Sequence, residues 1–417
     1  MILFYNLFLI VYKAGIYIVS SWNRKAKLWI TGRRNVFQKL KQSLPASDHL
    51  HKTIWMHCAS LGEFEQGRPV LRKIKEEDPG VIIILTFFSP SGYEIVKNNK
   101  DFENVFYLPM DSVVHARKWM NMVNPDLVLW VKYEYWHYYL QEIKKRNIPL
   151  LMVSGVYMHD QVFFKWYGSF YRNMLNSFTH FFVQNENSKE QLKKIIAEER
   201  ITVSGDTRCD RVINIAENFI EVPGIADFCG DSKVVVAGST WEDDEAEWIH
   251  YVKQHSEIKF IIAPHEIDQE NLADVKKEFP GSVFYSEYMA SSFVNAGEIN
   301  CLIIDNIGTL SRLYHYATIA YVGGGYGENG LHNILEAAVY GKPVIFGPEY
   351  EKNFEARELI DCTGAISIES AIELEKVADS LLNNQAELLS RSHAAKNYVY
   401  KNAGATDTII QFINSKG

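Results

Sequence analysis

The sequence predicts an α/β protein built from two doubly wound domains, each with a parallel sheet covered by helices on both faces. Continuous apolar, β-branched runs alternate with helical stretches along most of the chain, which is the pattern of strands buried on both sides. The 417 residues suffice for two or three domains, and 47% of them are hydrophobic, so each domain can bury a core. No low-complexity linker or short-period repeat interrupts this pattern.

The N-terminal segment, residues 1–47, is apolar first and basic afterwards. It has eight Lys and Arg residues and no acid, and because the net charge of the whole chain is -8, the remainder carries -16. About 20 apolar residues are barely enough to span a bilayer, and basic residues directly after them favour the anionic, cytoplasmic leaflet. We expect an N-terminal membrane anchor, either a short span or an interfacial helix, with the body in the cytoplasm. A helix packed on the domain is the alternative.

Further features of the sequence argue against a secreted, a nucleic-acid-binding and a metal-binding protein. The segment ends without a small-residue cleavage site, which argues against a cleaved signal peptide, and its front is too apolar for a nucleic-acid-binding arm. Five scattered cysteines without a CxxC pattern indicate a reducing compartment and neither a disulfide framework nor a zinc site. Asp243 and Asp244 more plausibly lie on a solvated helix face than on a metal. We therefore expect no metal and no nucleic-acid partner.

The first domain is expected over residues 48–210. Its strands are predicted at 53–57, 81–88, 105–109, 126–131, 149–154, 180–183 and 201–203. A second domain is expected over residues 211–395, and a C-terminal helix over 396–417 that packs back on the first domain. Strands of the second domain are predicted at 233–237, 259–263, 282–285, 301–304, 319–322 and 343–346.

A glycine cluster follows the apolar run 317–322. Gly323, Gly324 and Gly325 allow backbone amides to approach a ligand, and a helix is expected from about Leu331, with Asn333 and Glu336 on one face. Amides at a helix start bind phosphate, and a carboxylate one turn later can accept the hydroxyl groups of a ribose. The pattern therefore suggests a nucleotide site, although an ordinary βα turn of a parallel sheet has the same glycines.

Other turns combine small or hydroxyl residues with a following helix. Glu63 lies in the first turn of a helix after the strand at 53–57, where it is either a general base or a helix-capping acid. Ser91 and Gly92 begin another helix and suit an anion. Ser239 and Thr240 can bond a phosphate or cap the acidic helix after them.

Taken together, these motifs resemble the 3-deoxy-D-manno-octulosonic acid (Kdo) transferases of lipopolysaccharide synthesis, over nearly the whole chain. That family's Ser-x-Gly-Glu motif is matched by Ser60-Leu-Gly-Glu63, so the resemblance implies that Glu63 is the general base and that Ser60 and Gly62 lie on the acceptor side. Pro90-Ser-Gly92 and Tyr133-Glu-Tyr-Trp136 match two further acceptor motifs. They add Ser91, Gly92 and Glu134 to the expected acceptor site.

On the donor side, the family's Gly-Gly-Ser…Gly-Gly-His-Asn-x-Leu-Glu motif is matched by Gly323-Gly-Gly325 and Asn329-Gly-Leu-His-Asn-Ile-Leu-Glu336. The resemblance implies a donor or CMP site at these residues: Ser239, Thr240, Pro264, His265, Gly308, Gly323, Gly324, Gly325, Asn333 and Glu336. One departure is that Pro264-His265 lacks the arginine of the family's Pro-Arg-His. Another residue, such as His265 or Lys352, would then contact the phosphate.

The resemblance implies the GT-B fold, with two Rossmann-like domains facing a cleft. It also implies an inverting glycosyltransferase that moves Kdo from CMP-Kdo to a lipid A precursor (lipid IVA), without a metal or cofactor, at the cytoplasmic face of the bacterial inner membrane. The expected partners are CMP-Kdo, the lipid A precursor and the lipid surface. The alternatives are a GT-B transferase that uses a UDP-sugar on a lipid-linked acceptor, and an inactive membrane-bound nucleotide-sugar binder.

Overall fold

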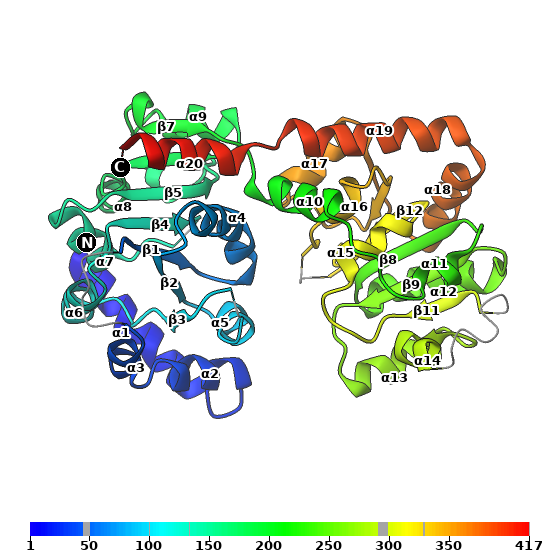
Figure 1. Ribbon diagram of the computed structural model, residues 1–417, viewed down its shortest axis with the longest axis horizontal. Coiled ribbons are helices and arrows are strands. Elements are labelled where there is room, and N and C mark those ends of the chain that lie inside the picture. The colour runs from blue at the N-terminus through cyan, green and yellow to red at the C-terminus, as the bar shows by residue number, and fades with distance from the viewer. Residues whose placement is uncertain (45–50, 100, 133, 291–298, 328–329, 417) are drawn as a thin grey trace. The chain divides into compact units, whose positions relative to one another are not determined.

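A computed structural model of the chain describes residues 1–44, 51–99, 101–132, 134–290, 299–327 and 330–416. The chain forms two compact units, one of Met1–Asp210 with Gly404–Gly417 and the other of Arg211–Ala403. Each unit is a parallel sheet covered by helices, as the sequence predicts (Figure 1). The expected limit between residues 47 and 48, and the motif residues Tyr133 and Asn329, lie outside the described residues.

Unit 1 has a seven-stranded sheet of order β3-β2-β1-β4-β5-β6-β7, in which every neighbouring pair is parallel. Its strands are β1 Thr53–Cys58, β2 Ile82–Phe87, β3 Asn104–Tyr107, β4 Leu127–Val131, β5 Leu150–Gly155, β6 His180–Val183 and β7 Ile201–Val203. Its helices are α1 Ile2–Val19, α2 Arg24–Gly32, α3 Val36–Ser43, α4 Leu61–Glu77, α5 Pro90–Val96, α6 Val113–Val123, α7 His137–Lys145, η1 Val162–Phe164, α8 Ser169–Leu175, α9 Glu186–Leu192, η2 Glu198–Arg200 and α20 Ala405–Lys416.

The two faces of this sheet have separate cores. On one face, apolar side chains of α4 and α20 pack against Met56 and Leu129. On the other, α3, α6, α7 and α8 surround Trp55 and Trp130. Burial on both faces explains why the strands read as uninterrupted apolar runs.

Unit 2 also has a seven-stranded parallel sheet, of order β10-β11-β9-β8-β12-β13-β14. Its strands are β8 Val234–Thr240, β9 Lys259–Pro264, β10 Val283–Phe284, β11 Cys301–Ile303, β12 Ile319–Val322, β13 Val344–Phe346 and β14 Ala365–Ser367. Its helices are α11 Ile225–Cys229, α12 Glu242–Gln254, α13 Gln269–Glu278, α14 Tyr285–Ala290, α15 Leu310–Leu313, η3 Tyr314–Tyr316, α16 Leu335–Ala338, α17 Phe354–Asp361, α18 Ala371–Asn383 and α19 Gln385–Lys401. Helix α10, Thr207–Glu217, begins in unit 1 and ends in unit 2.

Two expected helix limits were wrong. The helix expected from Leu331 begins only at Leu335 and is a single turn, because the Asn333 side chain accepts a hydrogen bond from the Leu335 amide (3.3 Å) and ends the preceding loop there. The limit expected between residues 395 and 396 falls inside α19, where Ala395 and Val399 are both buried. The break comes instead at Gly404, whose φ of +96° favours glycine.

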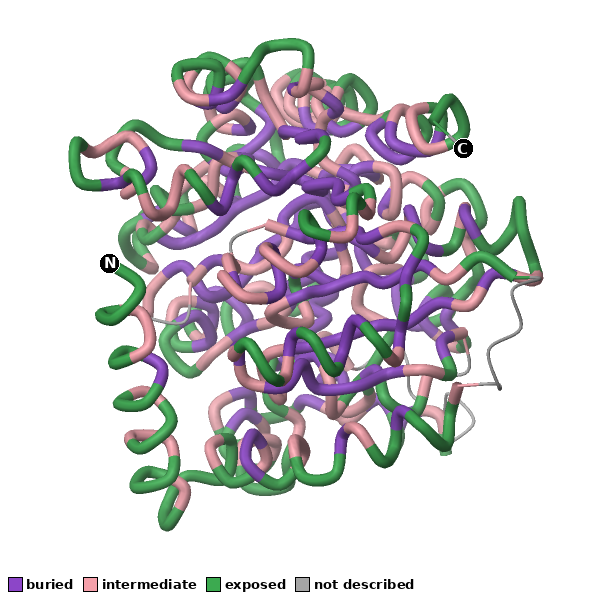
Figure 2. Tube along the Cα trace, turned by 90° about the vertical axis from the view of Figure 1, so that its left-hand side faces the viewer, coloured by how far each residue is buried: buried purple, intermediate pink, exposed green. Residues whose placement is uncertain are grey.

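Helix α1 is attached to unit 1 along one side and exposed along the other. The Tyr5 hydroxyl donates to Asp111 (2.5 Å), Tyr138 donates its hydroxyl hydrogen to Asn6 (2.8 Å), and Leu9 is buried. The remaining side is apolar and open, so most of α1 is drawn as exposed or intermediate in Figure 2. Among the described residues, α1 is the one helix long and apolar enough to cross a membrane by length and composition.

The basic segment after α1 does not lie entirely on the surface. The Arg33 guanidinium donates to the carbonyl oxygens of Leu108 (2.9 Å), Phe88 (2.6 Å) and Trp29 (3.1 Å), and it stacks 3.8 Å from the Trp29 ring centroid. Burial lowers the pKa of Arg33 to about 9. This arginine fixes α2 against the ends of β2 and β3.

The attachment of α1 through Asp111 predicts a specific pH dependence of stability. Burial raises the pKa of the Asp111 carboxyl to about 6, so the folded state binds this proton more tightly than the unfolded chain does. The contribution of this group to the free energy of unfolding therefore falls as the pH rises from about 4 to 6. Asp111→Asn cannot titrate, and we expect its unfolding free energy to lack this fall, which is roughly 2–3 kcal/mol.

Urea unfolding of both proteins between pH 4 and pH 7 measures this difference. Parallel stability curves for the wild type and Asp111→Asn would contradict the assignment, because all other titrating groups are common to both proteins.

Candidate functional site

Both sheets reverse their strand order at one point, between β1 and β4 in unit 1 and between β8 and β12 in unit 2. Open parallel sheets bind ligands at the carboxyl ends of the strands beside such a point. Glu63 and Glu134 follow β1 and β4, while Ser239 and Gly323 lie at the ends of β8 and β12. These four of the predicted acceptor and donor residues therefore lie at the switch points of the two sheets.

In unit 1, a buried histidine joins three strands at this edge. His57 Nδ1 lies 2.9 Å from Thr86 Oγ1, and His57 Nε2 lies 2.9 Å from Glu134 Oε2. The same carboxylate oxygen accepts a hydrogen bond from the Trp136 indole (3.0 Å). Since an ionised carboxylate only accepts hydrogen bonds, Nε2 of His57 carries the proton toward Glu134. Glu134 is thus held rigidly beside the end of β1.

Glu63 lies in the first turn of α4 and is almost fully buried, with 8% of its surface exposed. Its Oε2 accepts a hydrogen bond from the Ala59 amide, one residue before the N-cap Ser60, so the side chain turns back over the start of its own helix much as a capping acid does. The capping interpretation and the general-base interpretation are therefore compatible, because one carboxylate oxygen fixes the orientation of the side chain. A base held in this way has a defined direction toward its substrate.

The small residues of the predicted acceptor motifs differ in how closely the protein packs around them. A Cβ on Gly62 would meet only Ser60 Oγ, at 4.0 Å, so this exposed turn has space above it. A Cβ on Gly92 would lie 2.2 Å from the Phe87 ring, so packing alone requires that glycine. Ser91 is exposed at the start of α5, where its hydroxyl lies 2.6 Å from Ser89 Oγ.

An aromatic cluster beside Glu134 was not foreseen from the sequence. The Phe88 ring lies 4.6 Å from Trp136 and 6.1 Å from Tyr12 of α1, and Arg33 stacks on Phe88 at 4.8 Å. The aromatic content around Trp136 was the available signal. Helix α1 is thereby brought next to the predicted acceptor residues.

In unit 2, a buried aspartate organises the edge of the sheet. Asp244 accepts hydrogen bonds from the Trp241 amide (3.0 Å), the Gly324 amide (2.8 Å) and the Tyr321 hydroxyl (2.7 Å), and it is only 1% exposed. The expected solvated position of Asp244 was therefore wrong, because its carboxylate points into the turn rather than outward. Burial raises the pKa of this carboxyl above its ordinary value.

The glycine cluster is packed against protein on all three residues. A Cβ on Gly323 would lie 2.4 Å from the Ser239 carbonyl oxygen, and one on Gly325 would lie 2.6 Å from the Gly347 nitrogen. The amides of Gly323 and Gly324 donate to Gly238 O (2.9 Å) and to Asp244. These two amides are used inside the unit, so the phosphate expected at them needs other partners.

Three stacked rings lie beside this turn. The His265 ring is 4.6 Å from Trp241 and 4.4 Å from His332, and both pairs are stacked. The Trp241 indole donates to His332 Nε2 (3.1 Å), and burial together with His265 lowers the pKa of His332 to about 4. At neutral pH His332 is therefore uncharged, with its proton on Nδ1.

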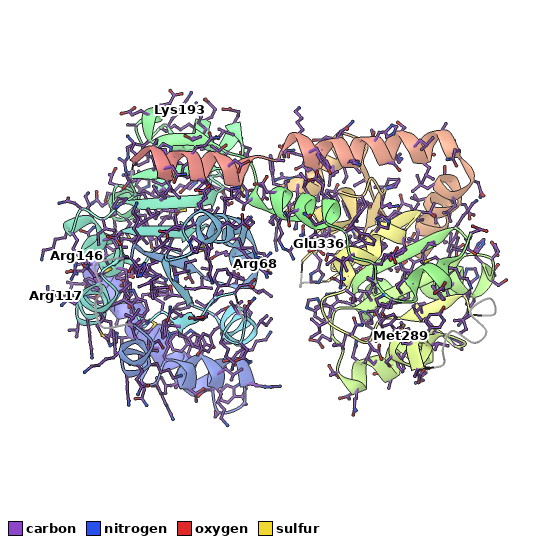
Figure 3. All side chains as sticks on the ribbon, in the orientation of Figure 1. Arg68, Arg117, Arg146, Lys193, Met289 and Glu336 are labelled. Carbon is purple, nitrogen blue, oxygen red and sulfur yellow. The ribbon has the colours of Figure 1, made fainter. Side chains whose placement is uncertain are left out.

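A charged group that the motifs do not include contacts the predicted nucleotide residues. Arg211 Nη1 lies 3.1 Å from Glu336 Oε1, which also accepts from the Asn333 side-chain amide (3.3 Å). Glu336 is labelled in Figure 3 on unit 2. Arg211 lies more than a hundred residues before Glu336, so only the tertiary structure identifies it.

The remaining donor residues lie in different surroundings. Thr240 is buried and donates its hydroxyl hydrogen to Glu245 (2.7 Å), whereas Ser239 is partly exposed with φ +54°. Pro264 ends β9, and the exposed His265 donates its amide to Thr240 O (2.9 Å). Gly308 has φ +91° and open space where a Cβ would lie.

Within the described residues, no group of three or more His, Cys, Asp or Glu side chains is placed to hold a metal ion. The expectation of a metal-free site stays a prediction.

Comparisons with known proteins find Kdo transferases among the similar sequences. A family model described as 3-Deoxy-D-manno-octulosonic-acid transferase (kdotransferase) matches residues 32–211. The 3-deoxy-D-manno-octulosonic acid transferase of Rickettsia felis is 25% identical over 89% of this chain and 81% of its own length, and that of Aquifex aeolicus is 24% identical over 84% and 93%. A bifunctional glycosyltransferase/methyltransferase of Fusobacterium nucleatum is 28% identical over 80% of this chain, which spans only 53% of that relative.

Solved structures agree on the fold. The UDP-GlcNAc 2-epimerase of Neisseria meningitidis has a TM-score of 0.62 at 14% identity, covering 87% of this chain and all of that one. A glycosyltransferase of Rickettsia africae has a TM-score of 0.56 at 16% identity, covering 87% and 98%. These likenesses concern the fold alone, and they confirm the GT-B class.

The hydrogen bonds to Asp244 predict a large effect of its removal. Asp244→Ala leaves the buried amides of Trp241 and Gly324 without an acceptor, and we expect it to lower the free energy of unfolding by about 3 kcal/mol. Asp243→Ala removes the same charge from the exposed neighbouring position, and we expect a change within about 0.5 kcal/mol. Equal effects in thermal unfolding would show that the contacts of Asp244 are not what matters.

Proposed function

We propose that this chain, a glycosyltransferase related to the Kdo transferases, transfers Kdo from CMP-Kdo to a lipid A precursor, lipid IVA. The acceptor is a sugar hydroxyl of that lipid, and the anomeric carbon is inverted. The relatives named above support Kdo transfer through their described activities. The observation that carries the proposal is that Glu63 and the His57–Glu134 pair follow the two strands that flank the switch point of a parallel sheet, where both carboxylates act electrostatically on Cys58.

Glu63 is the proposed base. As the acceptor oxygen attacks the anomeric carbon, Glu63 takes the hydroxyl proton, and the bond from that carbon to the CMP phosphate breaks with its electron pair leaving on CMP. The Ala59 amide holds one carboxylate oxygen in place. We assign the acceptor sugar to the open space at Gly62, the residue before Glu63.

The acceptor side is completed by groups that bind without reacting. Glu134 is oriented by His57 and Trp136, and we assign it to hydroxyl groups of the acceptor sugar. The exposed Ser91 at the start of α5 is the proposed polar contact on the opposite side of the acceptor.

The donor is proposed to bind unit 2. Asn333 and Glu336 suit the ribose hydroxyls, and Arg211 holds Glu336 in orientation through a 3.1 Å contact. The phosphate is assigned to the neighbourhood of Ser239 and His265, because the amides of Gly323 and Gly324 are used within the unit. No metal or other cofactor enters this scheme.

The site of action is proposed to be the cytoplasmic face of the bacterial inner membrane. The exposed apolar side of α1 attaches the protein to the lipid surface, while Tyr5 and Asn6 fix the helix to unit 1. An apolar helix held along one side by a folded unit favours an interfacial position over a free span.

The first test is transfer from CMP-Kdo to lipid IVA by the purified protein in detergent, with CMP and UDP as competitors. We expect product, and inhibition by CMP alone. Glu63→Gln keeps a hydrogen-bond acceptor for the Ala59 amide but removes the base, so we expect kcat to fall by about 10²–10⁴-fold with little change in stability. Glu65→Gln removes the same charge from the same helix and serves as the matched control.

Three results would contradict parts of the proposal. Inhibition by UDP in place of CMP would favour the other GT-B donor class. Full activity of Glu63→Gln would remove Glu63 as the base. Absence of product with fresh donor would overturn the assigned donor and acceptor.

The contact between Arg211 and Glu336 predicts a separate effect on the donor. Arg211→Met leaves the Glu336 carboxylate without its cation, and we expect CMP to bind about tenfold more weakly, which is roughly 1.4 kcal/mol. Arg211→Lys should recover part of the affinity. Arg357→Met, at an exposed position of α17, is the control. Titration calorimetry with CMP measures each variant, and unchanged affinity in Arg211→Met would remove this residue from the donor site.

A further inference from the structure

Unit 1 contains a cavity that lies outside the residues assigned to sugar transfer. An open cavity of about 600 Å³ lies where α7 and α8 meet η2. Gln141 and Lys144 come from α7, Asn173 from α8, Asn176 from its end and Arg200 from η2. The lining is therefore rich in hydrogen-bond donors.

Of the two cations of the cavity, Arg200 interacts electrostatically with Glu199, the acid directly before it in the chain, and no ion pair is formed between them. Lys144 is exposed, and one nitrogen of Arg200 donates to the Phe178 carbonyl oxygen. Within the described part of the chain neither side chain forms an ion pair, and none of the described lining residues is acidic. Of the neighbouring acids, Glu142 is engaged by Arg117 and Arg146. Two cations with amide donors around them match the chemistry of a phosphate group.

The wall of the cavity is continuous with the apolar helix α1. His137 and Phe170 line the cavity, and the Tyr5 ring lies 5.8 Å and 5.6 Å from them. The Nδ1 atom of His137 is buried without a hydrogen-bond partner among the described residues. On the same end of α1, Leu3 and Phe4 are 79% and 73% exposed. Because Tyr5 contacts the wall of the cavity, we expect the chains of a lipid bound in the cavity to contact this exposed end of α1.

We propose that this cavity binds the phosphodiester headgroup of an anionic membrane lipid, with Lys144 and Arg200 as the charged contacts and Gln141, Asn173 and Asn176 as polar contacts. The site gives the protein a preference for anionic over zwitterionic bilayers and fixes its rotation about α1 at the surface. A soluble phosphate offers the same charge but has no chains for α1 to contact. The lipid is therefore the occupant to which the geometry points.

This inference rests on the proposed membrane attachment through α1 but not on the transfer reaction. Binding to phosphatidylcholine vesicles measures the contribution of α1. The ratio of binding to phosphatidylglycerol and phosphatidylcholine vesicles measures the cavity. The membrane attachment through α1 and the headgroup site in the cavity can therefore be tested separately. Neither measurement needs CMP-Kdo or lipid IVA, so neither depends on the transfer reaction.

The experiment is co-sedimentation of the full-length protein with both kinds of vesicle. We compare Lys144→Glu with Lys145→Glu, which makes the same change of charge at the next, exposed residue of α7 outside the cavity lining. Since one basic residue near an anionic surface contributes about 1 kcal/mol, we expect Lys144→Glu to reduce the preference for phosphatidylglycerol at least fivefold more than Lys145→Glu does. Asn173→Leu, which leaves the net charge unchanged, should also reduce it.

The results distinguish a headgroup site in the cavity from a general effect of the net charge of α7. Equal losses in Lys144→Glu and Lys145→Glu, with none in Asn173→Leu, would show that only the net charge of α7 matters and would overturn the proposal. Titration calorimetry in which glycerol phosphate binds the wild-type protein as tightly as phosphatidylglycerol vesicles do would show that the acyl chains contribute nothing, and would overturn the lipid as the occupant of the cavity. Circular dichroism of each variant confirms that it is folded.

Discussion

The site in unit 1 depends on one constraint of its parallel sheet. At the switch point, the helices that follow the two neighbouring strands pack on opposite faces of the sheet. Helix α4 follows β1 into the core that contains Met56, while α7 follows β4 into the core that contains Trp55. The segments that follow β1 and β4 therefore lead to opposite faces of the sheet. Glu63 lies in the first turn of α4 and Glu134 lies between β4 and α7, so the topology places both beside the switch point before any detail of the chemistry.

Buried polar contacts then convert this edge into a site with fixed geometry. In unit 1 His57 joins Thr86 to Glu134, and in unit 2 Asp244 joins the first turn of α12 to the glycine cluster. Both are desolvated groups whose hydrogen bonds are satisfied, which rigidifies their surroundings. The roles of the neighbouring residues follow from these contacts. The Gly324 amide is committed to Asp244, and burial together with His265 lowers the pKa of His332, whose Nε2 accepts a hydrogen bond from the Trp241 indole.

Most strands could be predicted from the sequence because both faces of each sheet are buried. Such strands consist of uninterrupted runs of apolar residues. Strand β14 was missed, since Ala365–Ser367 has only three residues and ends in a polar one. The family resemblance supplied the expected roles of Glu63 and Glu336, which spacing alone left open. What no local pattern contained was the tertiary partner: Arg33 has the composition of a surface cation but lies under aromatic rings, and Arg211 meets Glu336 only after folding. Thr240 likewise has the pattern of a phosphate-binding hydroxyl, but donates to Glu245.

The division of unit 1 into two pieces of sequence has a consequence for biosynthesis. Helix α20 supplies Ile409 and Ile410 to the core on the α4 face, and Asp210 accepts hydrogen bonds from the amides of Gly404 (2.6 Å) and Thr406 (2.7 Å) at its start. These residues leave the ribosome after all of unit 2. The part of this apolar face that α20 covers therefore stays open while unit 2 is still being translated, and during this interval the growing chain is most exposed to aggregation and to chaperones.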